Sequence, residues 1–394
     1  MSGHEVIGKE ELNSIKEIFT KSNGVLFAHG FEAKRNNIFR VKEFERKLSK
    51  YLNCKYVACC SSGTAAGYLS LKALNIGSGD EVIVQSFTFI AAIESIIQTG
   101  ATPIVVDSDN YLGMDSKDLE SKITKKTKCI MPVHMLGESA NMKEILKVSK
   151  KYNLPIVEDA CEALGAKYKN KYLGTLGEVG FFSLDFGKII TSGEGGFICT
   201  DNTKIYNKIK ALRDHGHENK KGVHRGKDKA IEIGFNYRLS ELQAAVGIAQ
   251  LKKIKTLIKN KKKNKLFIKN YIKSNVKNNN YKFRPCYNPK SEQYDHLVIY
   301  LKNKVKAKNF YKLLEKEKIG TGILPVASKW HYAGYWDHIW KNSTSKKHNK
   351  YGLKFWKNTW NIINRAVSIH ISSIEKIEKI REKSKKIVNI LNSN

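Results

Sequence analysis

The chain of 394 residues contains 41% hydrophobic residues and carries a formal net charge of +33. Its length is typical of two domains, and no apolar run approaches the roughly 20 residues that a membrane-spanning helix needs. Because the first residues also lack the basic and apolar segments of a signal peptide, we expect a cytoplasmic protein without a membrane segment.

The positive charge is concentrated in the second half of the chain. Residues 1–200 carry 25 basic and 23 acidic side chains, whereas residues 201–394 carry 45 and 14. Such an excess of positive charge could bind nucleic acid or an anionic surface, or attract an acidic substrate. Lysine dominates over arginine, and the lysine runs lack the interleaved aromatic residues that stack on bases. We expect neither a nucleic-acid nor a membrane partner, and a basic nucleic-acid or anionic-surface binding protein is the alternative.

The seven cysteines lie mostly in apolar contexts and form no CxxC pair. This pattern favours reduced, buried thiols over disulfides. His215, His217 and His224 lack the spacing and companions of a zinc site, so no metal is expected. The cysteines are Cys54, Cys59, Cys60, Cys129, Cys161, Cys199 and Cys286.

Short β-branched runs alternate with helical patterns through the first 200 residues, as a mostly parallel α/β sheet requires. Loops rich in glycine and proline separate them. We therefore predict an α/β fold with a mixed, mostly parallel sheet flanked by helices. The predicted strands cover residues 56–60, 81–84, 103–107, 129–133, 155–158, 180–184 and 196–200, and the predicted helices cover 64–74, 89–98 and 141–152.

A long polar segment, residues 213–229, precedes the second half, and segments of this length are usually functional or disordered. Ser240 or Asn236 could start a long helix that runs to about Lys269. We place a domain boundary within this helix, which gives a large domain of residues 1–250 and a smaller α+β domain of residues 251–394. The smaller domain is predicted to contain a strand at 295–301, a helix at 310–318, a segment at 320–325 and a basic terminal helix from 374.

Lys188 lies between two predicted strands and before the glycine-rich turn of Gly193, Gly195 and Gly196. Its apolar neighbours indicate a desolvated amine with a lowered pKa, which is a candidate nucleophile toward an aldehyde or ketone. A surface lysine on a β-hairpin is the alternative. We expect the glycine turn to leave room for a ligand beside the amine.

A pyridoxal phosphate site also needs a phosphate cup, an anion near the pyridine nitrogen and usually a stacking ring. Ser61-Ser-Gly-Thr-Ala-Ala66 follows a predicted strand and starts a helix, where N–H groups and the positive helix end suit a phosphate. An ordinary helix cap is the alternative. The motif is neither a P-loop nor GxGxxG, so it predicts no ordinary nucleotide site.

Asp159 stands at the carboxyl end of a predicted strand, where open α/β sheets bind ligands. Its carboxylate would keep a pyridine nitrogen protonated, and Glu162 is close enough to bond the ring-hydroxyl side. Phe89 could stack on the ring. The alternatives are a helix cap or magnesium ligand for Asp159 and a core position for Phe89.

Together these motifs resemble the fold-type I, pyridoxal-phosphate-dependent sugar aminotransferases of the DegT/DnrJ/EryC1/StrS family. The resemblance extends from about Gly8 to about Ser368 and is densest between residues 43 and 251. The motifs are Ser61-Ser-Gly-Thr-Ala-Ala66, Gly79-Asp-Glu-Val-Ile83, Gly100-Ala-Thr-Pro103, Pro132-Val-His134, Glu158-Asp-Ala160 with Ala163-Leu-Gly165, Phe182-Ser183, Lys188-x-x-Thr-x-Gly-Glu-Gly-Gly196 and Gly234-Phe-Asn-Tyr-Arg-Leu-Ser-Glu-Leu-Gln-Ala-Ala245.

The resemblance implies a role for each matching residue. Lys188 takes the place of the lysine that forms a Schiff base with the cofactor, and Asp159 that of the pyridine-nitrogen partner. Glu162 takes the place beside the cofactor hydroxyl, and Phe89 that of the stacking aromatic.

The remaining matches concern the phosphate and the second subunit. Gly63, Thr64 and Ser183 match phosphate contacts. Asn236 matches an asparagine that family members insert from the partner, which implies a homodimer with shared active sites. The polar segment before it would then cover the neighbouring active site.

The family's chemistry implies that glutamate donates an amino group to a keto- or aldehyde sugar, giving an amino sugar for surface polysaccharide or lipopolysaccharide. Lysine at position 188 argues against the family's dehydratases, which carry histidine there. A cofactor-binding regulator without turnover is a further alternative. His217 and His331 could bind substrate hydroxyls or a carboxylate.

Most of the family acts on nucleotide-linked keto-sugars, and we expect an acidic or nucleotide-linked keto-sugar as the acceptor. An oxidised octulosonate, aminated at C8, is a specific candidate, because four segments look closer to the subgroup that acts on it: Met131-Pro-Val-His-Met135, Phe182-Ser-Leu-Asp185, Asp214-His-Gly-His217 and Trp330-His-Tyr332.

Overall fold

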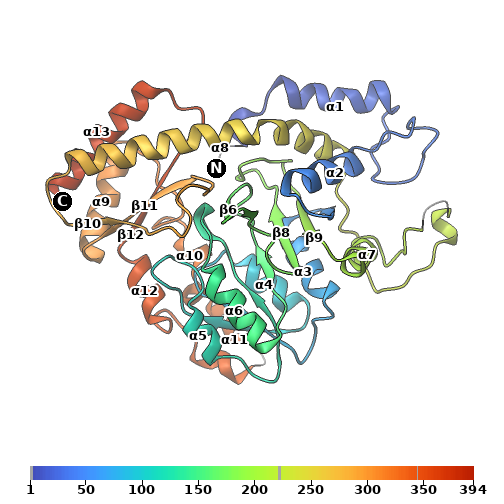
Figure 1. Ribbon diagram of the computed structural model, residues 1–394, viewed down its shortest axis with the longest axis horizontal. Helices are drawn as coiled ribbons and strands as arrows, with labels where there is room; N and C mark the ends of the chain where they lie inside the picture. Colours follow the sequence, from blue (N-terminus) through green and yellow to red (C-terminus); the bar gives the residue numbers. More distant parts are fainter. Residues whose placement is uncertain (1–2, 221–222, 344) are drawn as a thin grey trace.

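A mixed sheet of seven strands lies at the centre of the molecule in a computed structural model that describes residues 3–220, 223–343 and 345–394 (Figure 1). The strands are β1 (Tyr56–Cys60), β2 (Glu81–Gln85), β3 (Thr102–Val106), β4 (Thr127–Met131), β5 (Val157–Asp159), β8 (Val179–Ser183) and β9 (Gly196–Thr200). Two hydrogen-bonded sets, β3-β2-β4 and β5-β8-β9-β1, join through parallel bridges from Ile130 to Ile156 and from Val133 to Asp159. Strand β9 runs antiparallel to both of its neighbours, and the other pairings are parallel. The predicted mixed, mostly parallel sheet is confirmed.

Helices cover both faces of this sheet, because strands made of near-continuous apolar residues must be buried on both sides. These helices are α2 (Arg40–Leu52), α3 (Gly63–Ala73), α4 (Ala91–Gln98), α5 (Ser116–Ser121), α6 (Met142–Tyr152) and α7 (Thr203–Leu212). On one face, Val84 and Met131 share a core with α3, α4 and α7. On the other face, Ile83 and Ile130 pack with α5 and α6. A hairpin of β6 (Lys167–Tyr168) and β7 (Lys171–Tyr172) lies outside the main sheet.

Helix α8 (Glu241–Asn275) is 35 residues long and runs along the top of the molecule in Figure 1, with α1 (Lys9–Lys21) beside its first half. Ser240 caps it, because its hydroxyl and backbone exchange hydrogen bonds with the third helical residue. Ile248 packs in a core of the large sheet that includes residues of α2, β1 and β9, whereas Ile268 belongs to a separate core of the C-terminal part. One helix therefore joins both parts, and the boundary at residue 250 remains a prediction.

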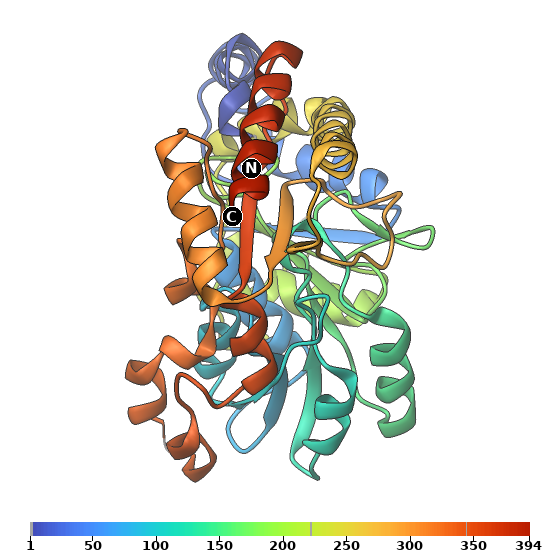
Figure 2. The ribbon, with the colours of Figure 1, turned by 90° about the vertical axis from the view of Figure 1, so that its left-hand side faces the viewer.

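A three-stranded antiparallel sheet forms the centre of the C-terminal part (Figure 2). Its elements are β10 (Tyr281–Phe283), β11 (His296–Leu301), β12 (Ala366–His370), α9 (Lys304–Lys316) and α13 (Ile377–Ser393). Helix α9 begins at Lys304 rather than at the predicted Phe310, because Asn303 caps it by accepting the N–H of Lys306. The predicted smaller α+β part is confirmed.

The segment between α9 and β12 packs against the large sheet, in the core that α3, α4 and α7 share. Tyr332, Trp336 and Trp356 are buried there, and Tyr332 forms a backbone bridge with Phe87, just after β2. Short helices in this segment are α10 (Ser328–His331), α11 (Asp337–Lys341) and α12 (Lys357–Ile363). Within the described residues, no helix combines the length and apolar character needed to span a membrane.

Candidate active site

Lys188 lies in the loop that joins β8 to β9, two neighbouring antiparallel strands of the large sheet that are labelled in Figure 1. Its side chain is 13% exposed, and Nζ lies 3.7 Å from Oδ2 of Asp185. The Lys188 N–H donates to the carbonyl of Asp185 at 3.1 Å, which closes a turn of this loop. The side chain is therefore largely buried, and the alternative of a surface lysine is wrong.

Carboxylates, rather than apolar groups, set the charge of Lys188. Burial lowers the pKa of its amine, but the negative charges of Glu162, Asp185 and Asp159 outweigh burial and raise the pKa above the ordinary lysine value. The predicted lowering is therefore wrong, because the flanking sequence shows apolar neighbours and not the carboxylates that the fold brings in. At neutral pH the amine of the cofactor-free protein is held as an ammonium.

Two carboxylates lie at the carboxyl end of β5, because Asp159 ends the strand and Glu162 follows three residues later. Asp159 is 6% exposed and accepts the N–H of Cys161 at 3.0 Å. Burial raises the pKa of Asp159, and the hydrogen bond from Cys161 and the charge of Lys188 oppose this rise. Glu162 is also buried, and its Oε2 accepts the N–H of Leu136 at 2.9 Å. The structure thus brings both predicted carboxylates into the electrostatic environment of Lys188.

Aromatic side chains lie on the other side of Glu162. His331 Nε2 is 3.9 Å from Glu162 Oε1, and the rings of His331 and Phe89 are 5.2 Å apart. Burial lowers the pKa of His331, so this ring is neutral at physiological pH. Phe89 is 43% exposed and Trp330, which stacks beside it, is 59% exposed. Phe89 is therefore not the core aromatic of the alternative, and it is open to a ligand.

The turn between β1 and α3 packs against the end of β8. Ser62 caps α3 by accepting the N–H of Ala65 at 3.0 Å, and the first-turn N–H groups of Gly63 and Thr64 have no intrahelical acceptor. A Cβ on Gly63 would lie 2.8 Å from Cβ of Ser183, so these two residues are in close contact. The three predicted phosphate contacts, Gly63, Thr64 and Ser183, therefore lie together at the positive end of a helix.

The glycine-rich turn before β9 is needed for close packing. Gly195 has a φ of 152°, and a Cβ there would lie 2.6 Å from Ser192 Oγ and 3.0 Å from Leu239 Cδ1. A Cβ on Gly196 would collide with the carbonyl of Ser62. Protein atoms therefore fill the space at Gly195 and Gly196, which lets the Lys188 loop approach the turn before α3. At Gly193 an added Cβ would meet nothing within 4 Å, and room for a ligand beside the amine remains a prediction.

These residues fit pyridoxal phosphate. A side chain on Gly63 would collide with Ser183, so the structure requires glycine at this position. A phosphate needs such a residue, because it must approach the backbone N–H groups closely. Asp159 would hold the pyridine nitrogen, Phe89 would cover a ring face and Lys188 would bind the aldehyde carbon.

The last two predicted residues lie before α8, with His217 in the polar segment and Asn236 between this segment and the helix. His217 faces Asp228, with 3.7 Å between Nδ1 and Oδ2. Asn236 is exposed, and the carbonyl of its neighbour Tyr237 accepts the N–H of Ser61 at 2.9 Å. In the described part of the chain, the side-chain contact of His217 stays within this segment. The substrate role of His217 and the partner-site role of Asn236 remain predictions.

Three groups at the site were missed by sequence reasoning. Asp185 precedes Lys188 by three residues, a spacing at which charged side chains meet in a single turn, so a signal was present. The N–H of Leu136 has no sequence signal, because its direction depends on a left-handed φ of 60°. Trp330 reaches Phe89 from a distant part of the chain, and only its position next to His331 hints at the contact.

A family model for the DegT/DnrJ/EryC1/StrS aminotransferase family matches residues 34–390. The chain belongs to this family. Aminotransferases of the DegT/DnrJ/EryC1/StrS family depend on pyridoxal phosphate, in agreement with the residues gathered around Lys188.

Two similar curated proteins of this family are GDP-perosamine synthases. The one from Caulobacter vibrioides is 42% identical over 215 residues, which cover 54% of this chain and 57% of that protein. The one from Escherichia coli O157:H7 is 42% identical over 223 residues, which cover 56% and 60%. The matched stretch therefore spans less than two thirds of either relative.

The structure of an aminotransferase from Psychrobacter cryohalolentis has a TM-score of 0.83 to this chain, at 21% sequence identity and over 98% of both chains. At this identity the likeness shows the fold alone. The predicted fold-type I architecture is confirmed.

Proposed function

We propose that this chain is a pyridoxal-phosphate-dependent aminotransferase that moves an amino group from glutamate to a keto- or aldehyde sugar. The observation that carries the proposal is the environment of Lys188, a largely buried amine on which Glu162, Asp185 and Asp159 act together. When bound, pyridoxal phosphate supplies an aldehyde for an amine and a ring that withdraws electrons from the donor's Cα.

The side chains of the site would bind and orient the reacting groups. The N–H groups of Gly63 and Thr64 would hold the phosphate at the start of α3. Asp159 would accept a hydrogen bond from the protonated pyridine nitrogen. The free amine of Lys188 would take up and return the proton of the donor's Cα.

The carboxylates around Lys188 influence the protonation state of its amine. The amine attacks an aldehyde only when neutral, whereas Glu162 and Asp185 favour the ammonium. Oδ2 of Asp185 lies 3.7 Å from Nζ and its side chain is 43% exposed, so this carboxylate can pass a released proton on to solvent.

We propose that the acceptor is a keto-sugar with an anionic group. The name GDP-perosamine synthase of two relatives supports a nucleotide-linked sugar, and segments such as 330–332 support an acidic octulosonate as the second candidate. His331 Nδ1 lies 2.8 Å from the carbonyl of Ala327, to which it donates, so Nε2 is left to accept a hydrogen bond. His331 would therefore read a sugar hydroxyl.

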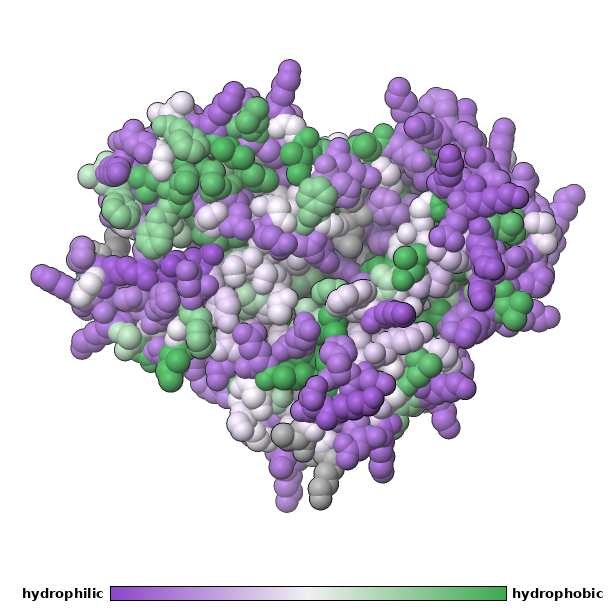
Figure 3. All heavy atoms as spheres, turned by 180° about the vertical axis from the view of Figure 1, so that it is seen from behind, coloured by the Kyte–Doolittle hydropathy of each residue, from purple (hydrophilic) through white to green (hydrophobic). Residues whose placement is uncertain are grey.

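We further propose a homodimer with shared active sites. Phe31, Ile233 and Phe235 are 59%, 85% and 50% exposed, and Arg238 stacks over Phe27 to join the two segments that carry them. A green area gathers on this side of the molecule, at the upper left of Figure 3. A second copy would cover this apolar surface and bring the exposed Asn236 to the partner's cofactor.

We place the reaction in the cytoplasm. All seven cysteines are free and most are buried, as is usual for proteins of reducing compartments. The amino sugar would then be built into surface polysaccharide or lipopolysaccharide.

The proposal is tested by turnover of the cofactor-loaded protein with glutamate and one acceptor at a time. A nucleotide-linked keto-sugar and an oxidised octulosonate form the two arms, and 2-oxoglutarate and the amino sugar are measured by mass spectrometry. We expect stoichiometric 2-oxoglutarate and amino sugar in one arm. Release of 2-oxoglutarate in neither arm, for a panel of both sugar classes, contradicts the proposal. Light scattering should give twice the mass of the 44.7 kDa chain, and a monomer would contradict the shared site.

A further inference from the structure

Four charged side chains are buried together where the C-terminal part meets the large sheet. Glu138, Lys265, Arg284 and Glu292 are each at most 6% exposed. Lys265 Nζ pairs with Glu292 and lies 3.4 Å from Glu138 Oε1, while Arg284 Nε lies 3.6 Å from Glu138 Oε2. The two basic side chains pair with the two carboxyl groups, as burial of ionic groups requires. Burial raises the pKa of Glu292 to about 7, against the charge of Lys265, which lowers it.

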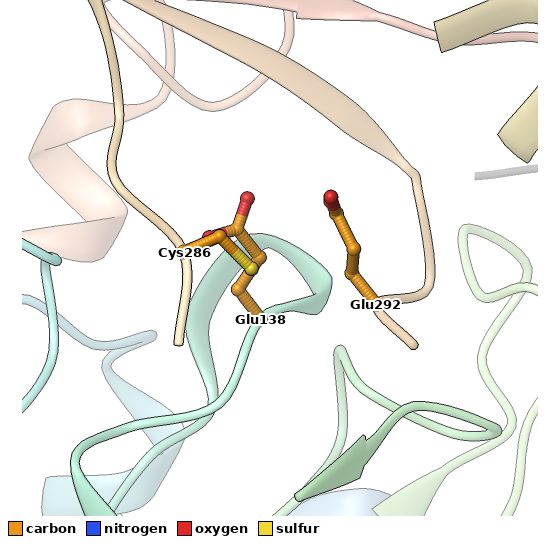
Figure 4. Close-up of side chains that lie close together, drawn as sticks. All are labelled: Glu138, Cys286 and Glu292. Atoms are coloured by element: carbon orange, nitrogen blue, oxygen red, sulfur yellow. The ribbon is translucent and has the colours of Figure 1, made fainter. Parts of the chain in front are cut away.

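Glu138, Cys286 and Glu292 also bring three potential metal ligands within 4.8 Å of one another (Figure 4). Both carboxylates already pair with the ammonium of Lys265, so a cation stands at this position. We therefore read the group as an ion-pair cluster and assign no metal to it.

The C-terminal part also holds the turn Met135–Gly137, directly before Glu138. Arg284 Nη1 donates to the carbonyl of Met135 at 3.0 Å, and the N–H of Gln293 donates to the carbonyl of Gly137 at 2.9 Å. A Cβ on Gly137 would lie 2.9 Å from Cβ of Gln293, so the two parts of the chain are in direct contact there. Leu136, at the centre of the turn, has a left-handed φ that side chains rarely adopt without outside support.

We propose that this buried cluster positions Glu162 for the reaction. The N–H of Leu136 donates to Glu162 Oε2 at 2.9 Å, so the turn that the cluster holds also fixes a carboxylate of the active site. The other oxygen, Oε1, lies 3.9 Å from His331 Nε2. Glu138, Lys265 and Arg284 are thus positioning residues that act through the turn, and this inference rests on the proposed function.

The expected consequence of disturbing the cluster is a misplaced carboxylate. Without the charge of Glu138, Lys265 and Arg284 lose an ion-pair partner, and Arg284 no longer fixes the turn through the carbonyl of Met135. The N–H of Leu136 then no longer holds Glu162 in one place. The charge beside the cofactor's hydroxyl then moves, which changes the pH at which the bound cofactor changes its visible absorption. The C-terminal part is thereby coupled to the chemistry without touching the cofactor.

The test compares Glu138→Gln with Asp295→Asn in the full-length, cofactor-loaded protein. Asp295 pairs with Lys261, another buried lysine of α8, and is the matched control for loss of a buried ion pair. The readouts are the melting temperature, the pH midpoint of the cofactor's visible band and the rate at which glutamate bleaches that band. Both variants should melt earlier. Only Glu138→Gln should shift the pH midpoint and slow bleaching, by roughly three- to tenfold.

A double variant shows whether the effect passes through Glu162. Glu138→Gln added to Glu162→Gln should change neither the pH midpoint nor the bleaching rate further. If Glu138→Gln fails to fold, Arg284→Lys takes its place, because it keeps the charge and loses the bond to Met135. An unchanged pH midpoint, an equal shift in Asp295→Asn, or full additivity with Glu162→Gln would overturn the inference. A wild type that glutamate never bleaches would instead overturn the proposed function itself.

Discussion

Two buried lysines of this chain stand among carboxylates in different ways. Lys265 contacts Glu292 directly and lies 3.4 Å from Glu138. Lys188 has its nearest ion-pair partner, Asp185, at 3.7 Å. Burial lowers the pKa of both amines, and the carboxylates around each outweigh burial and raise the pKa above the ordinary lysine value.

The difference separates a structural ion pair from an amine that can react. Lys265 is 4% exposed and its Nζ pairs with Glu292 and Glu138, so its amine is part of the ion-pair cluster. Lys188 shares Glu162 with His331, whose ring lies 5.2 Å from that of the exposed Phe89. A raised pKa and burial therefore do not by themselves mark a reactive lysine, whereas neighbours of the kinds that a cofactor needs do.

Lys188→Ala should have the largest effect. The amine that binds the aldehyde is lost, so the visible band of the bound cofactor and the production of amino sugar should both disappear. The fold should persist, because within residues 3–220, 223–343 and 345–394 the ion pair of this side chain is a long one of 3.7 Å, and circular dichroism should match that of the wild type. A visible band that persists in this variant would contradict the claim that Lys188, and not another lysine, is the reactive amine.

Asp159→Asn should reduce turnover by about a hundredfold or more, because a neutral amide does not hold a protonated pyridine nitrogen. Its effect on stability should have the opposite sign. Burial raises the pKa of Asp159, so its contribution to stability falls as pH rises through the folded-state pKa, and the ionised group is unfavourable at pH 7. Denaturant unfolding of the cofactor-free variant at pH 7 should therefore show equal or greater stability. A less stable variant with wild-type turnover would contradict both roles.

Lys265→Met should lower the free energy of unfolding by about 3–5 kcal/mol, because it leaves two buried carboxylates without their partner. The matched change Lys188→Met should cost less than about 1 kcal/mol, since the long ion pair to a half-exposed Asp185 contributes little. Urea unfolding of both cofactor-free variants measures the difference. Equal losses would remove the distinction between the two lysines.

Asp185→Asn should have the smallest effect. Removing this negative charge lowers the pKa of Lys188, so the amine becomes neutral at lower pH. The rate of cofactor uptake, followed as growth of the visible band, should therefore reach its half-maximal value at lower pH than in the wild type. Because Glu162 remains, the shift should be smaller than that of Glu162→Gln, and a shift toward higher pH would contradict the assignment.

Much of the fold could be predicted because its signals are local. The seven strands of the large sheet are short apolar runs between turn residues, and each was placed to within about two residues. The start of α9 was misplaced because its cap, Asn303, is followed by a lysine-rich first turn, and the first large buried side chain of the helix is Phe310. The sequence also could not show that residues 330–332 return to the large sheet, since this contact joins distant segments.

The candidate site was predictable where a motif carries the residue and not where the fold assembles it. Lys188, Asp159 and Gly63 each stand in a motif at the end of a strand. The pKa of Lys188 was predicted with the wrong sign, because two of its three carboxylates, Asp159 and Glu162, come from the end of β5 and not from its own loop. The hold of Leu136 on Glu162 depends on a backbone direction, which residue types do not reveal.

Borohydride trapping tests the central claim most directly. Reduction turns the double bond between a lysine nitrogen and the cofactor's aldehyde carbon into a stable amine, and peptide mass spectrometry then locates the modified lysine. We expect the cofactor's mass on Lys188 alone, with Lys265 unmodified. A label on another lysine, or none in protein incubated with excess pyridoxal phosphate, would contradict the claim that Lys188 is the amine of an aminotransferase site.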